Sequence, residues 1–95
     1  MLKLDSGNVL LKGSHRRQLM HWLRRAIRLG ERLGDFVLNL RLVRVGRLYE
    51  ARAAVHSSAG DFACRSRGRS SVDACREIAR QIVMMLHRQH LQATT

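Results

Sequence analysis

The sequence predicts an α/β (α+β) two-layer sandwich with the order β-α-β-β-β-α, in which two helices cover one face of a four-stranded sheet. Residues 14–33 and 69–91 carry apolar stripes at helical spacing, residues 35–68 alternate with period two, and turn residues separate these segments. The chain has 95 residues, no proline and no repeats, which leaves room for one modest core. We therefore expect a single domain over residues 1–95.

The first strand and first helix follow from the N-terminal third. "LKLD", residues 2–5, is a short candidate strand, and "SGN", residues 6–8, is a turn signal. Ser14 is placed to cap a helix that runs to about Gly30 or Leu33, with the Gly30 and Gly34 region as its stop. One face of this helix is apolar: Leu19, Leu23, Ala26, Ile27, Gly30 and Leu33. A separate arc of roughly 100° is basic: Arg17, His21, Arg24, Arg25, Arg28 and Arg32.

The middle of the chain predicts three strands in an antiparallel meander. Residues 36–43, 49–56 and 62–67 alternate, with turns near Gly46 and at "SSAG", residues 57–60. One face of the sheet packs on the core and the other is polar and basic. The core-facing positions are Phe36, Leu38, Leu40, Leu42, Tyr49, Ala51, Ala53, Val55, Phe62, Cys64 and Ser66.

The last helix is predicted over residues 69–91, where Ser70 and Asp73 resemble a capping box. Its apolar stripe consists of Val72, Cys75, Ile78, Ala79, Ile82 and Leu86. Its basic side chains cluster away from that stripe, at Arg76, Arg80 and His87, with Arg88 further round.

The charge of the chain favours a polyanionic partner. There are 18 Lys and Arg against 7 Asp and Glu, for a net charge of +11, and only Lys3 and Lys12 are not arginine. Glu31 is the only carboxylate between residues 14 and 34. A helix face that is merely solvated more often mixes both signs, so we expect this arc to contact nucleic acid. Arginines of the sheet region could also contact RNA or could keep the sheet soluble: Arg41, Arg44, Arg52, Arg65, Arg67 and Arg69.

Catalysis and metal binding find little support. Cys64 and Cys75 both fall on predicted core faces, where a thiol stays protonated, reduced and unreactive. Cys75 lies about 18 Å along its helix from His87, too far to share a zinc ion with His87 and His90. No nucleophile elbow, phosphate-binding glycine loop or carboxylate pair is present. We therefore expect no enzyme, no metal, no cofactor and no small-molecule substrate.

Aromatic and membrane functions are weaker alternatives. Trp22 and Tyr49 are expected at the margin of the core rather than as base-stacking platforms. The first helix has the amphipathic character of an interfacial membrane helix, but its apolar face is needed to cover the sheet. The sequence shows no signal peptide and no apolar run of about 20 residues, so we expect a cytoplasmic protein.

The order and spacing of several segments resemble the short ribosome hibernation-promoting factors, also called ribosome-associated inhibitor or protein Y. The segments that carry the resemblance are "LDSGNV", "LMHWLRRAIRLGERLGDFVLNLRLVRV", "YEARAAVHSSAGDFACRSRG" and "SSVDACREIARQIVMMLHRQH". The resemblance implies binding to the small ribosomal subunit, the 30S particle, at its tRNA and mRNA sites through 16S rRNA. It also implies translational silencing under stress, without catalysis.

Several positions bear on the implied interface. Arg25, Arg28 and Arg88 are similar to basic positions of the family, whereas Gln81 and Met84 stand where the family is often basic. The last helix also departs from the family at its first residues, where this chain reads "SSVDACR". The long form of the family carries a C-terminal dimerisation domain; we expect this chain to be without one and not to pair ribosomes by itself, and we expect a monomer.

We predict one set of rRNA-binding residues, here named the helix-face arginines: Arg17, Arg24, Arg25, Arg28, Arg76, Arg80 and Arg88. Their guanidinium groups would grip phosphate oxygens. Two alternatives stay open. The chain could be a general structured-RNA-binding or ribosome-assembly module, since double-stranded RNA-binding domains also combine a sheet with helices, or its basic faces could bind an acidic protein.

Overall fold

The elements of the computed structural model follow the predicted order. The structure describes residues 2–5, 7, 12–32, 34–58 and 60–93. The elements are β1 (Leu2–Asp5), α1 (Gly13–Arg32), β2 (Phe36–Val45), β3 (Leu48–Ser57), β4 (Gly60–Gly68) and α2 (Ser71–Ala93). The predicted β-α-β-β-β-α order and two-layer class are confirmed. Leu33 and the turn residues 6, 8 and 59 lie outside the described residues.

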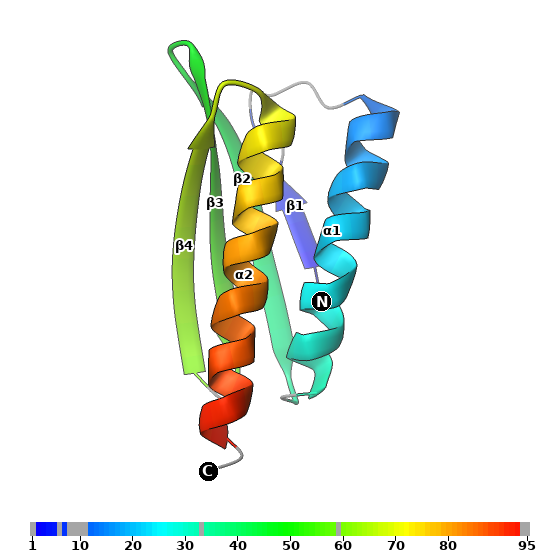
Figure 1. Cartoon of the computed structure of the whole chain (residues 1–95), viewed down its shortest axis with the longest axis vertical. Helices are drawn as coiled ribbons and strands as arrows, with labels where there is room; N and C mark the ends of the chain where they lie inside the picture. Colours follow the sequence, from blue (N-terminus) through cyan, green and yellow to red (C-terminus); the bar gives the residue numbers. More distant parts are fainter. Residues whose placement is uncertain (1, 6, 8–11, 33, 59, 94–95) are drawn as a thin grey trace.

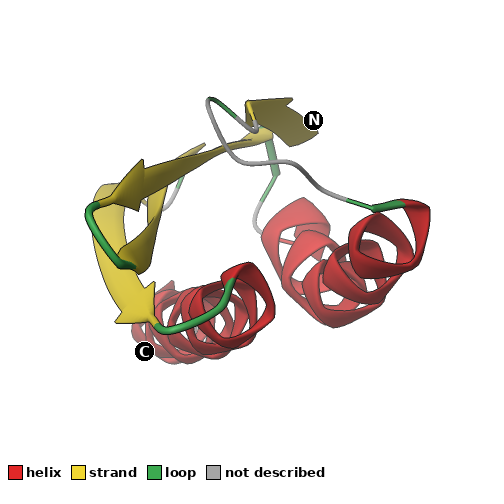
Figure 2. Ribbon diagram, turned by 90° about the horizontal axis from the view of Figure 1, so that it is seen from above, coloured by secondary structure: helices red, strands yellow, loops and turns green. Residues whose placement is uncertain are grey.

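The four strands form one mixed sheet with the spatial order β1-β2-β3-β4. The meander β2-β3-β4 is antiparallel, as predicted, and β1 is parallel to β2. Two parallel neighbours need a crossover connection, and α1 supplies it. Both helices lie on the same side of the sheet (Figure 1), and the sheet curls around α2 so that its other face stays open (Figure 2).

The core lies between the sheet and the helices. Alternate residues of β2 are buried, whereas Ile27 of α1 and Val72 of α2 are only half-buried. Trp22 and Tyr49 pack against the margin of this core, as predicted. The buried apolar residues are Leu19, Leu23, Ala26, Phe36, Leu38, Leu40, Leu42, Ala51, Ala53, Val55, Ala74, Cys75, Ile78, Ala79, Ile82 and Leu86.

The beginning of α1 differs in detail from the sequence prediction, whereas its end agrees with it. The helix begins at Gly13, and the Lys12 carbonyl accepts a hydrogen bond from the Arg16 N–H at 3.0 Å. The prediction that Ser14 caps the helix is therefore wrong, since Ser14 lies within the first turn. At the other end, α1 continues through Gly30 to Arg32. Gly34, with a φ of +100°, donates its N–H to the Glu31 carbonyl at 3.3 Å and ends the helix there.

The start of α2 confirms the predicted cap. The Ser70 hydroxyl accepts the Asp73 N–H at 3.1 Å, and the Ser70 carbonyl accepts the Ala74 N–H at 3.2 Å. The buried Ser66 hydroxyl donates to the Ala74 carbonyl at 2.6 Å. Because Ser66 belongs to β4, this bond fixes the first turn of α2 against the edge of the sheet.

Glu50 is a buried acid on the open face of the sheet. The strand alternation places it away from the helices, yet its side chain is only 1% exposed. The carboxylate accepts hydrogen bonds from the Nε atoms of Arg52 and Arg67, the latter at 3.0 Å. Arg52 and, to a smaller degree, Arg67 outweigh the effect of burial and lower the pKa of Glu50 below its usual 4.5.

We expect Glu50 to make folding stability depend on pH in acid. A lowered pKa in the folded state means that the ionised carboxylate stabilises the fold. This contribution is complete above the unfolded value near 4.5 and disappears as the pH falls through the lowered pKa. Thermal unfolding from about pH 7 to pH 3 should show a shallower acid decline for E50Q than for the wild type. E31Q, which removes an exposed carboxylate, is the control, and an E50Q profile parallel to the wild type would contradict the assignment.

Candidate nucleic-acid interface

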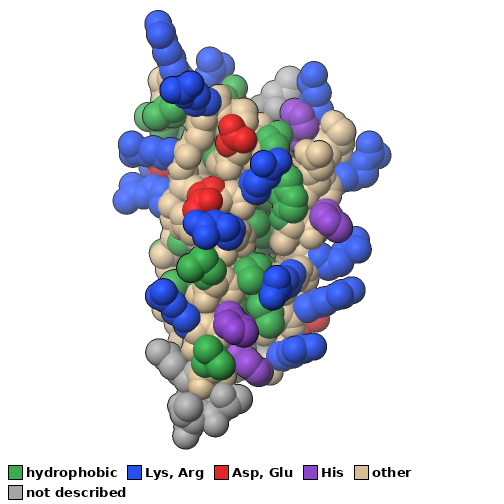
Figure 3. Space-filling view, viewed as in Figure 1, with side chains coloured by type: hydrophobic (Ala, Val, Ile, Leu, Met, Phe, Trp, Pro, Cys, Tyr) green, Lys and Arg blue, Asp and Glu red, His purple; other side chains and the backbone are tan. Residues whose placement is uncertain are grey.

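The outward face of α1 presents a continuous set of cations to solvent. Four of the helix-face arginines lie on it, and all four are exposed: Arg17, Arg24, Arg25 and Arg28. Because α1 buries only its opposite side, through Leu19, Leu23, Ala26 and Gly30, none of these guanidinium groups is needed for packing. Basic side chains accordingly line the side of the molecule formed by α1 (Figure 3).

A groove between the two helices brings part of the predicted set together. It has a volume of about 580 Å³, and Arg25 of α1 faces Arg76 and Arg80 of α2 across it. The remaining lining residues are Trp22, Ala79, Val83, Met84 and His87. Figure 3 shows this apolar seam between the helices with basic side chains beside it. The groove was not predictable from the sequence, because no local pattern of residues specifies which sides of the two helices meet.

Trp22 fixes one of these arginines. The Arg76 guanidinium carbon lies 5.2 Å from the centre of the Trp22 ring, within the range of a cation–π contact. Trp22 is half-buried against the core, so the ring is a rigid support. The contact orients Arg76 toward the groove while leaving its side chain exposed.

Arg80 is the least available of the three groove arginines. Its guanidinium donates two hydrogen bonds to Glu77, at 2.7 and 3.1 Å, and a third to the Met84 sulfur at 3.5 Å. Arg80 lowers the pKa of Glu77, and Glu77 raises that of Arg80. The ion pair lies on the surface, with side chains 63% and 40% exposed, so a phosphate could compete for Arg80.

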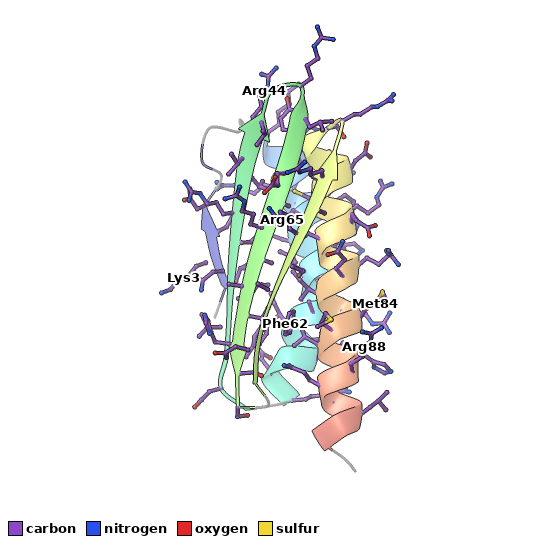
Figure 4. The ribbon with its side chains drawn as sticks, turned by 90° about the vertical axis from the view of Figure 1, so that its left-hand side faces the viewer. Lys3, Arg44, Phe62, Arg65, Met84 and Arg88 are labelled. Atoms are coloured by element: carbon purple, nitrogen blue, oxygen red, sulfur yellow. The ribbon has the colours of Figure 1, made fainter. Side chains whose placement is uncertain are left out.

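Arg88 lies on the other flank of α2. It borders a smaller hollow of about 200 Å³ beside β4, together with Arg80, Cys64 and Met85. Figure 4 shows Arg88 and Met84 on the outer side of α2. The structure therefore does not bring Arg88 to the groove between the helices, nor does it bring Arg17, Arg24 or Arg28 there.

Gln81 and Met84, which the sequence resemblance places at positions that are often basic, are uncharged side chains of α2. Met84 is 44% exposed and lines the groove, and Gln81 donates a hydrogen bond to Glu77 at 3.4 Å. Arg76 lines the groove one turn before Arg80.

The thiols lack the features of reactive groups. Cys64 and Cys75 are both free, and burial raises the pKa of each to about 11. We expect a thiol reagent such as Ellman's reagent to react slowly with the native protein at about pH 8 and quickly after unfolding in denaturant. Fast reaction of either cysteine in the native protein would contradict this placement.

The described part of the chain also bears on metal and membrane binding. Within residues 2–5, 7, 12–32, 34–58 and 60–93, no three His, Cys, Asp or Glu side chains gather as they would around a metal ion. Neither helix, as far as it is described, has the length and apolar character that crossing a bilayer requires.

Solved structures share this arrangement of sheet and helices. The N-terminal domain of protein Y from Thermus thermophilus superimposes with a TM-score of 0.75, over 90% of this chain and 93% of that chain, at 17% identity. A ribosomal subunit interface protein from Coxiella burnetii gives a TM-score of 0.69, over 95% of this chain and 97% of that chain, at 8% identity. The chain has the protein Y fold.

The protein Y fold is the one that the sequence resemblance implies. Coverage of at least 90% leaves only short segments unmatched, so the sheet and both helices are shared. No protein-family model and no curated protein sequence matches the chain. The similarity to these solved structures is therefore a similarity of fold.

Proposed function

We propose that this protein is a ribosome-associated translation inhibitor that binds the 30S subunit through 16S rRNA phosphates and blocks the tRNA and mRNA sites of the decoding region. The observation that carries the proposal is the protein Y fold combined with the exposed cations of α1 and α2. That fold is shared with a protein described as a ribosomal subunit interface protein. The expected setting is a stress response in the cytoplasm.

The proposed mechanism is binding without chemistry. Arginine presents a planar fork that grips two phosphate oxygens at once, and folded RNA is recognised largely through its shape and phosphates. Arg25 and Arg76 face each other across the groove and would contact phosphates from two sides, with Arg17, Arg24 and Arg28 extending the surface along α1. Arg80 would release Glu77 and bind a phosphate instead. Arg88 would contact phosphate at the edge of the interface. We propose that one monomer occupies one subunit.

Co-sedimentation with purified 30S subunits tests the proposal. The protein is pelleted with subunits at one near-physiological salt concentration, because phosphate-driven affinity falls steeply with salt. Parallel samples contain tRNA and mRNA, or bulk double-stranded RNA as competitor. Stoichiometric pelleting that tRNA and mRNA abolish, and bulk RNA does not, is the expected result.

The other outcomes separate the alternatives. Pelleting lost equally to any RNA would identify a general structured-RNA-binding or ribosome-assembly module. An absence of pelleting, together with no RNA affinity at moderate salt, would indicate an acidic protein partner and would overturn the proposal.

A further inference from the structure

The open face of the sheet carries a row of like charges. In the strand register, Arg41 lies opposite Arg52, and Arg52 lies opposite Arg65, so three arginines stand side by side across β2, β3 and β4. Like charges directly opposite each other destabilise a sheet. Asp5 of β1 is the fourth member of the row, and its carboxylate lies 3.8 Å from Arg41 with both side chains more than 60% exposed. A pair so exposed offsets little of the repulsion.

The buried carboxylate of Glu50 offsets the repulsion between these arginines and positions their side chains. Its buried carboxylate accepts hydrogen bonds from Arg52 and Arg67, and it lies 3.9 Å from the Arg65 guanidinium. The arginine side chains remain 51–63% exposed above it. One carboxylate thus holds three guanidinium groups together in fixed orientations, with two positive charges in excess.

A hollow beside the row makes room for a ligand. It has a volume of about 880 Å³, and its charged lining residues are the four cations Lys3, Arg41, Arg52 and Arg65 and one acid, Asp5. Ala54 and Ala63 lie opposite each other in its floor, where their short side chains allow close approach to the strands. Figure 4 shows Lys3 on the side of the sheet that faces away from α2. Apart from Glu50, the acid that the described strands β2, β3 and β4 place on this face is Asp61, which pairs with His56 at 3.2 Å.

We propose that this open face is a second RNA-binding surface, which takes a phosphodiester backbone segment into the hollow beside Arg41, Arg52 and Arg65. Charge complementarity favours RNA, because four cations, one from each strand, line the hollow against a single acid, and the fork-shaped donors of arginine suit phosphate. A protein partner would more often require exposed aromatic or large apolar anchors, and the uncharged residues that strand alternation places on this face of the hollow are Asn39, Ala54 and Ala63. The protein would then contact RNA on both sides, through the helices and through the sheet.

The test uses fluorescence anisotropy with a labelled RNA duplex of about 16 base pairs at fixed salt. The starting protein is R25E/R28E, in which the helix face is reversed in charge. We expect it to retain RNA binding, and R41Q/R65Q added to it should weaken that binding by about tenfold or more and lower the salt slope by about two. Arg52 and Arg67 keep their hydrogen bonds to Glu50 in this variant, so the fold is preserved, and thermal unfolding verifies it.

The matched control is R47Q/R69Q in the same background, which removes two exposed arginines outside the row. If R41Q/R65Q and R47Q/R69Q reduce RNA affinity equally, the sheet-face proposal is overturned. It is also overturned if R25E/R28E does not bind RNA. Neither result contradicts the proposed function of the helix face. Tighter binding of poly-L-glutamate than of RNA, with the same dependence on Arg41 and Arg65, would also overturn it in favour of an acidic protein. R25E/R28E alone, compared with the wild type, reports separately on the proposed helix-face function.

Discussion

The variant R25E/R28E should lose 30S binding by at least about 100-fold while keeping its fold. Each hydrogen bond from a charged group to phosphate contributes about 1.5–3 kcal/mol, and charge reversal adds repulsion from the remaining phosphates. Both side chains are exposed on α1 and neither contacts the core, so the cost in stability should be small. Affinity measured by co-sedimentation, together with a thermal unfolding curve, checks both parts of the expectation.

R47E/R69E is the matched control for this result. It makes the same change in net charge at exposed positions in the β2–β3 turn and between β4 and α2. We expect a much smaller, salt-sensitive effect, because these side chains lie off the helix face. Unchanged 30S affinity for R25E/R28E would remove the outward face of α1 from the proposed mechanism.

Gly30→Ala should destabilise the protein by about 1–3 kcal/mol, even though alanine is the better helix former. A Cβ atom at Gly30 would lie 2.3–2.5 Å from three ring atoms of Phe36, a distance at which the ring or the helix must move. Phe36 is itself buried at the start of β2, so the ring has little room. For a chain of 95 residues, the midpoint of thermal unfolding should fall by about 4–8 °C per kcal/mol.

Gly13→Ala provides the control within the same helix. A Cβ atom at Gly13 meets nothing within 4 Å, so the substitution should be neutral or slightly stabilising. The double variant G30A/F36L should recover part of the loss, because leucine relieves the contact with the ring. If G30A and G13A have the same midpoint, the Phe36 ring does not restrict residue 30.

Properties that depend on a single element were predictable from the residues alone. The alternation in residues 36–43 identified the buried side of β2, because successive side chains of a strand point to opposite faces. Helical spacing likewise separated the buried side of α1 from the arc that contains Arg25 and Arg28. The Ser70 cap was also predictable, since it joins residues only three apart in the chain.

Properties that join distant segments required the packed structure. Gly30 was predictable as part of the end of α1, but only the packed structure shows that the Phe36 ring occupies the space that a side chain at residue 30 would need. Glu50 fits the polar side of the strand alternation, and its burial follows from arginines that β3 and β4 bring over it.

The same division applies to the interface. The composition and the charge arc of α1 predicted a polyanion partner, because net charge and helical spacing are properties of the chain and of one helix. Arg25 and Arg76 line the same groove, and Arg88 lies outside it. This arrangement depends on how α1 and α2 pack side by side. The row formed by Arg41, Arg52 and Arg65 depended on strand register. Helix packing and strand register arise from contacts between side chains that are far apart in the sequence. They therefore cannot be predicted from local periodicity.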